Sequence, residues 1–175
     1  MLSYVNGWAY CDSMTVDQPF ELRICLGELS EEIEDLLEDQ LDAGVARLSG
    51  VPYVTALQDA PDGIEAAHRL IARLNDLGAE VVVLDADYVT RSEIAERLGA
   101  TRQAVALWAA GQRQAGCPFP QPAIQAGVSL WCWSDVTCWA LESGHMIDEG
   151  VRLLSRDEIA IINGELAAGR LPIFA

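Results

Sequence analysis

Residues 89–108, which read VTRSEIAERLGATRQAVALW, have a pattern that few folds can satisfy. Thr90, with Glu93 three residues later, forms a capping-box signature and predicts the start of a short helix. Gly99 permits the left-handed backbone that a tight turn requires, and Thr101 can cap a second helix. We therefore expect two short helices that cross steeply at a glycine turn. Their core-facing residues are predicted to be Ile94, Ala95, Leu98, Val105 and Trp108.

The segment after these helices predicts a hairpin and a supporting helix. Three prolines between residues 118 and 122 end helical structure and favour extended backbone. Residues 123–133 indicate a short hairpin around Ala126-Gly127, and Ser134 is expected to cap the next helix. Two helices followed by such a hairpin form a winged helix-turn-helix. The alternative is a pair of packed helices that binds nothing.

This pattern resembles the small winged helix-turn-helix proteins of the excisionase, AlpA and MerR type, above all actinobacterial regulators in which it follows an α/β domain. The matching residues are Ser92, Ile94, Ala95, Leu98, Gly99, Thr101, Arg102, Val105, Trp108, Phe119, Pro120, Gly127, Trp131, Trp133, Val136 and Trp139. The stretch before them, from Ile64 to Thr90, also resembles the preceding domain of those regulators, and no known ligand comes with it.

The resemblance implies a sequence-specific transcription regulator that binds double-stranded DNA. The recognition helix, about 101–110, would enter the major groove, and the wing, about 122–133, would lie near phosphates. The implied DNA-binding residues are Arg91, Ser92, Thr101, Arg102, Gln103, Gln112, Arg113, Gln125 and Ser129. For each arginine, a solvated surface charge is the alternative. The wing lacks the basic residues that are usual in this family, which predicts weak phosphate anchoring.

The three tryptophans at 131, 133 and 139 have two readings. Their rings could stack on nucleic-acid bases, or they could pack between the wing and the helices. Their alternation and spacing favour packing in the core.

The chain before this segment predicts a small α/β domain. Residues 20–26 indicate a strand, and Ile33, Leu36, Leu37 and Leu41 mark the apolar face of a helix. Residues 45–48 and 51–57 indicate a hairpin around Ser49-Gly50. A helix at about 62–77 and a strand at 79–84, expected to be buried on both faces, complete a βαββαβ order. This order predicts a ferredoxin-like unit.

The expected fold class is therefore α+β, with a ferredoxin-like domain followed by a winged helix-turn-helix domain. The predicted divisions are a loosely ordered arm at 1–18, the acidic α/β domain at 19–86, the winged domain at 89–143 and a helical extension at 144–175. In the extension, Ser155 and Glu158 form a second capping box that opens a helix to about Ala168. A homodimer through the open sheet face or through this C-terminal helix is a hypothesis.

The net charge of −16 is unevenly distributed along the chain. Residues 1–88 hold 18 acids and 4 arginines, whereas residues 89–134 hold 2 acids and 4 arginines. Exposed charges are largely screened beyond about 8 Å at physiological salt. The acidic domain should thus weaken non-specific DNA affinity without excluding contacts from the arginine-bearing segment.

Other classes of protein receive less support from the sequence. His68 and His145 have no nucleophile or acid at a diagnostic spacing, and no phosphate-binding loop occurs, so we expect neither an enzyme nor a cofactor. The five cysteines form no CxxC pair, which disfavours a metal site or a disulfide framework. No apolar run reaches the roughly 18–20 residues that span a bilayer, so the expected location is the cytoplasm.

The alternative function is a protein-binding adaptor, an antitoxin or a DNA mimic. Eight acids and no base lie between Glu28 and Asp42, and this acidic surface would bind a basic partner.

Overall fold

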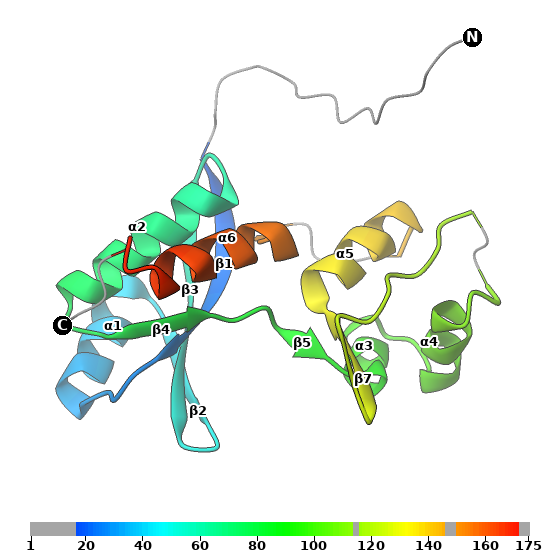
Figure 1. The fold of residues 1–175 in the computed structure, drawn as a ribbon, viewed down its shortest axis with the longest axis horizontal. Coiled ribbons are helices and arrows are strands. Elements are labelled where there is room, and N and C mark those ends of the chain that lie inside the picture. The colour runs from blue at the N-terminus through cyan, green and yellow to red at the C-terminus, as the bar shows by residue number, and fades with distance from the viewer. Residues whose placement is uncertain (1–16, 114–115, 146–149, 172–175) are drawn as a thin grey trace, which may run out of the picture.

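The computed structural model describes residues 17–113, 116–145 and 150–171. In these ranges the chain forms six helices and eight strands, arranged in a five-stranded and a three-stranded sheet. The protein is thus a mixed α+β structure (Figure 1). Most of the predicted arm at 1–18 lies outside the described residues. Among the helices that are described, none is long and apolar enough to cross a membrane.

The five-stranded sheet has β1 at its centre. Its strands are β1 (Gln18–Leu26), β2 (Gly44–Leu48), β3 (Val51–Ala60), β4 (Val81–Leu84) and β8 (Arg152–Leu153). The order is β2-β3-β1-β4; β1 is antiparallel to β3 and β4 and parallel to β8. Ser49 and Gly50 turn between β2 and β3 with φ of 52° and 86°, which confirms the predicted hairpin.

Three helices contribute to the core on one face of this sheet: α1 (Glu31–Leu41), α2 (Gly63–Asp76) and α6 (Arg156–Ala167). The inward residues of β1, such as Leu22 and Ile24, are buried with Leu37 and Ile71 from the helices. The predicted helix stripes are confirmed with one exception. Leu36 is 39% exposed, because it lies at the edge of the stripe formed by its neighbours at i, i+4 and i+8.

The prediction that the strand at 79–84 is buried on both faces is wrong. Val82 is 51% exposed and Val83 is 37% exposed, while Val81 and Leu84 are buried. β4 pairs with β1 on one side only, and the helices that complete the core cover one face of the sheet. Its apolar run therefore reflects an edge strand with one covered face.

The C-terminal segment returns to the first core. The helix stripe of Ile159, Ile162 and Leu166 is buried there, and the capping box at Ser155 opens α6 as expected. The Asn163 side chain accepts a hydrogen bond from the Leu84 backbone N–H (2.8 Å) and donates one to its carbonyl (2.9 Å). This amide thus occupies the free edge of β4 in the manner of another strand.

A second hydrophobic core lies to the right in Figure 1. In the sequence, its residues come between the two parts of the chain that build the first core. Its elements are α3 (Arg91–Arg97), α4 (Arg102–Ala109), α5 (Trp133–Glu142) and a sheet of order β5-β7-β6, formed by β5 (Tyr88–Val89), β6 (Ile124–Ala126) and β7 (Val128–Cys132). β5 and β8 were not predicted from the sequence; two-residue strands carry no readable periodicity.

The predicted cap of α5 is wrong. The N-cap is Cys132, and no side chain caps the helix. Ser134 lies inside the first turn, buried, with its hydroxyl 3.1 Å from Cys132 Sγ. Instead, the Trp133 N–H donates to the carbonyl of Asp87, which precedes β5. This hydrogen bond gives the first N–H group of the helix a partner that the helix itself cannot provide.

Asn163→Ala should destabilise the protein by about 1–3 kcal/mol, because it removes two hydrogen bonds and leaves polar groups of buried Leu84 unpaired. Urea unfolding measures the change. Ile161→Ala on the exposed side of α6 is the control and should change stability by less than about 0.5 kcal/mol. Equal effects of the two variants would show that the amide does not hold α6 on the sheet.

Candidate nucleic-acid interface

Helix α3 begins with the predicted capping box. The Thr90 hydroxyl accepts from the Glu93 N–H (3.3 Å), and the Glu93 carboxylate accepts from the Thr90 N–H (2.7 Å). These hydrogen bonds, the one from the Thr90 backbone first, lower the pKa of Glu93 below its ordinary value of 4.5. Arg91 and Ser92 occupy the first turn, with Arg91 exposed and Ser92 half-buried.

The turn into α4 has the expected geometry. Gly99 has φ of +60°, and the Ala100 N–H closes the turn on the Ala95 carbonyl (2.8 Å). The Thr101 hydroxyl then accepts from the Ala104 N–H (3.1 Å) and caps α4. The first residues of α4, Arg102 and Gln103, are exposed to solvent.

An aromatic cluster packs against the buried side of α4. Trp108 packs against Phe119 and Trp139, with ring centroids 6.3 and 5.0 Å apart. The indole N–H groups of Trp131 and Trp139 donate to the carbonyls of Pro120 and Cys117, each at 3.0 Å. The predicted packing role is confirmed for these two tryptophans, and they tie the proline segment to the hairpin and to α5.

His145 belongs to the same cluster. Its ring lies 5.0 Å from both Trp108 and Trp139, and its Nδ1 is 2.9 Å from the Ser143 hydroxyl. The other histidine, His68, joins α2 to α6 through Glu165, with Nε2 and Oε2 2.8 Å apart. Both histidines therefore have structural partners.

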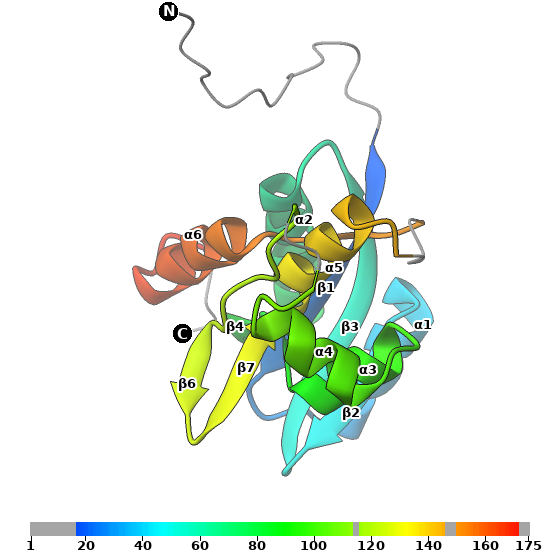
Figure 2. The ribbon, with the colours of Figure 1, turned by 90° about the vertical axis from the view of Figure 1, so that its right-hand side faces the viewer.

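The β6–β7 hairpin turns at Gly127, which has φ of +77°. Gln125 faces Ser129 across the hairpin; Gln125 is exposed and Ser129 is half-buried. The tip residue Val128 is 61% exposed. The exposed surface of the hairpin therefore contains apolar and uncharged polar residues but no arginine or lysine. Figure 2 shows it on the same side of the molecule as α3 and α4.

The arginines of this region fall into two groups. Arg91, Arg102 and Arg113 form no ion pair with any carboxylate in the described ranges, and all three are exposed. Gln112 and Arg113 follow Gly111, whose φ of +67° ends α4. Arg97 is different: it pairs with Asp87, and its guanidinium lies 4.8 Å from the Trp133 ring centroid. Arg97 is thus occupied within the protein.

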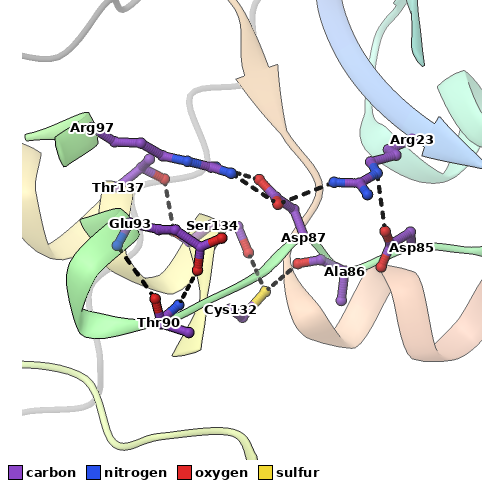
Figure 3. Close-up of polar contacts among 10 residues, drawn as sticks. All are labelled: Arg23, Asp85, Ala86, Asp87, Thr90, Glu93, Arg97, Cys132, Ser134 and Thr137. Carbon is purple, nitrogen blue, oxygen red and sulfur yellow. Dashed lines mark hydrogen bonds and ion pairs between the residues drawn. The ribbon is translucent and has the colours of Figure 1, made fainter. Parts of the chain in front are cut away.

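Asp87 joins the two cores, as Figure 3 shows. Its carboxylate contacts Arg23 of β1 (3.4 Å) and both terminal nitrogens of Arg97 on α3, while Arg23 also pairs with Asp85 (3.1 Å). Its backbone has φ of +44°, a conformation that aspartate tolerates better than most residues. Sequence reasoning missed this site, because no periodicity marks a pairing across 64 residues.

Metal-binding and thiol chemistry find little support in this region. In the ranges that the structure describes, no group of three or more His, Cys, Asp or Glu side chains could hold a metal ion. Cys132 lies with its Sγ 3.2 Å from the Ala86 carbonyl, and burial raises the pKa of the Cys138 thiol. A neutral thiol is a poor nucleophile, so Cys138 does not have the environment of a reactive cysteine.

Glu93→Gln should flatten the acid dependence of stability. The folded-state pKa of Glu93 is lowered, so its stabilisation is present above about pH 4.5 and is lost as the pH falls through the folded-state value. Urea unfolding of both proteins between pH 7 and pH 3 measures the difference. Glu96→Gln, whose carboxylate has no hydrogen-bond partner in the described part of the chain, is the control. A Glu93→Gln profile parallel to that of the parent protein would contradict the capping-box contribution.

A double-mutant cycle with Asp87→Asn and Arg97→Gln should give a coupling energy of about 1 kcal/mol, because the pair is bidentate but partly exposed. Asparagine keeps the tolerance for positive φ, so the cycle reports the ion pair. The same cycle with Arg91→Gln is the control and should give no coupling. Equal coupling in the two cycles would point to a general charge effect.

Compared with protein-family models, curated proteins and solved structures, the chain matches none of them. A functional assignment therefore depends on the motif residues and on their geometry. That geometry consists of two capped helices with an exposed, arginine-bearing face, supported by an aromatic core and flanked by an exposed hairpin.

Proposed function

We propose that this protein is a sequence-specific DNA-binding transcription regulator, in which a winged helix-turn-helix is attached to a ferredoxin-like domain. The observation that carries the proposal is the face formed by α3 and α4. It presents Arg91, Arg102 and Arg113, none of which is neutralised by a carboxylate of the described residues. Outside residues 89–134, four of the seven arginines, namely Arg23, Arg47, Arg69 and Arg156, pair with a carboxylate of the described residues.

The dimensions of α4 suit a recognition helix. The major groove, about 12 Å wide, admits an α-helix whose first turn contacts base edges. Arg102 and Gln103 lie in that first turn, and their side chains can form paired hydrogen bonds with guanine and adenine respectively. Thr101 precedes them as the N-cap of α4, and Ser92 lies in the first turn of α3; both carry hydroxyl groups that can donate to phosphates.

The distribution of charge supports local contacts over bulk attraction. The acidic residues lie mainly in residues 1–88, around the first core. Each neutralised phosphate contributes about −0.9 to the slope of the logarithm of the DNA-binding constant against the logarithm of the salt concentration. Three free arginines on α3, α4 and the loop after α4 predict a slope no steeper than about −3. The β6–β7 hairpin has no cation to add and would contact the backbone through Gln125 and Ser129.

A homodimer would place two such helices on neighbouring half-sites. The apolar stripe of α6 is used within the chain, which leaves the uncovered face of the five-stranded sheet as the proposed dimer surface. Leu57 and Val83 are exposed there. Binding to the chromosome would place the protein in the cytoplasm.

The experiment is a binding selection from random duplex DNA, followed by titration of the selected site and of DNA upstream of the protein's own gene. Arg102→Ala should weaken binding to the selected site by roughly tenfold or more and relax its base preference. Arg152→Ala is the control: it removes an exposed arginine of β8, on the other core, and should leave binding unchanged.

Two outcomes would overturn the proposal. Selection of no sequence at low salt would exclude sequence-specific recognition. Equal losses in Arg102→Ala and Arg152→Ala would show that only net charge matters. Either result would favour the alternative function, in which the exposed carboxylates of α1 bind a basic protein.

A further inference from the structure

A cavity of about 320 Å³ lies where the two cores meet. Along one edge of β1, β4 pairs with residues Ile24–Leu26 and β8 pairs with Phe20 and Glu21. The cavity lies beside the gap between them, and residues of α3, α5 and α6 complete its wall. Its volume falls in the range of small-molecule sites.

The two guanidinium groups that line the cavity are already neutralised. Arg23 pairs with Asp85 and Asp87, and Arg97 pairs with Asp87 (Figure 3). The Arg97 guanidinium also lies over the Trp133 ring. An incoming anion would have to displace these carboxylates and would face Glu21, the remaining acid of the lining. The cavity is therefore poorly suited to an anionic ligand.

One charge in the lining is left over. Glu21 lies on the exposed face of β1 at the mouth of the cavity, and its carboxylate forms no hydrogen bond or ion pair with any residue that the structure describes. The wall contains three carboxylates and two guanidiniums, so its unbalanced charge is negative. The Thr55 hydroxyl lines the same cavity and can accept a hydrogen bond from a donor bound near Glu21.

Apart from Ser134, the rest of the wall is apolar. Leu84, Leu153 and Ile159 line it, and Trp133 adds an aromatic ring. This combination of an apolar wall and one unbalanced carboxylate is complementary to a molecule with a hydrocarbon body and a single positive charge.

We propose that this cavity binds a small organic cation, a primary amine with an apolar group. Its ammonium pairs with Glu21 and donates to Thr55, and its apolar part lies against Leu84 and Ile159. The net charge of −16 raises the local concentration of such cations. The ligand would contact elements of both cores, since Glu21 lies on β1 and Trp133 begins α5, and it would favour their observed arrangement.

The test compares three probes with one skeleton: 2-phenylethylamine, 2-phenylethanol and 3-phenylpropanoate. Calorimetric titration and the thermal unfolding midpoint of the full chain are measured with each probe and with an aliphatic series of the same charges. The amines should bind and raise the midpoint, and the alcohols and carboxylates should bind at least about tenfold more weakly.

Glu21→Gln should weaken amine binding by about tenfold, because it removes the charge-assisted hydrogen bond. Glu38→Gln, which removes an exposed carboxylate from α1, is the matched control and should bind amines as the parent protein does. The fold of each variant is checked by its unfolding midpoint without probe.

Each of three results would overturn the proposal: no binding by either amine, tighter binding by the carboxylates, or amine binding that Glu21→Gln leaves unchanged. The experiment contains no DNA, so its outcome is independent of the proposed regulatory function.

Discussion

The arrangement of this protein depends on Asp87, whose carboxylate contacts an arginine from each of the two cores. Its carboxylate pairs with Arg23 on the central strand and with Arg97 on α3, while its backbone carbonyl accepts from the Trp133 N–H at the start of α5. The residue thereby positions the first helix of the α3–α4 pair and the helix behind it. Aspartate tolerates this positive φ, so a single residue supplies both the carboxylate charge and the backbone turn.

The return of the chain to its first core is the second constraint. β8 pairs with β1, and α6 is buried beside α2, so residues 88–142 lie between two segments of one hydrophobic core. A unit anchored at both ends moves less freely than one on a single linker. Asn163 strengthens the return, because its amide satisfies the edge of β4 at Leu84, just before the chain leaves for the second core.

The sequence predicted the features that arise from local interactions. The capping boxes at Thr90 and Ser155, the turn at Gly99 and the stripe of α2 each depend on residues within one or two turns, and all are confirmed. Features set by distant partners were missed or misjudged. The start of α5 depends on the Asp87 carbonyl, the exposure of Val82 depends on where β4 lies in the sheet, and Asp87 pairs with a strand 64 residues away. All of the candidate DNA-binding residues except Ser92 and Ser129 are exposed, and nothing in the sequence indicated that Arg97 would pair with Asp87.

The pairing of arginines determines how an acidic protein could contact DNA. A guanidinium that is already bound to a carboxylate must break that contact before it binds a phosphate, and the cost offsets much of the gain. Arg23, Arg47, Arg69 and Arg156 are paired in this way on the first core, and Arg97 is paired at the junction. Arg91 and Arg102 need no such exchange within the described structure, and they lie at the first turns of two adjacent helices. If the protein binds DNA as proposed, the acidic surface around the first core would repel it, and contact would occur at α3 and α4. That repulsion would lower the affinity for every DNA sequence alike, whereas a base contact from Arg102 would raise the affinity for one sequence. An acidic protein with a small cationic face would thus be suited to discrimination between sites more than to tight binding.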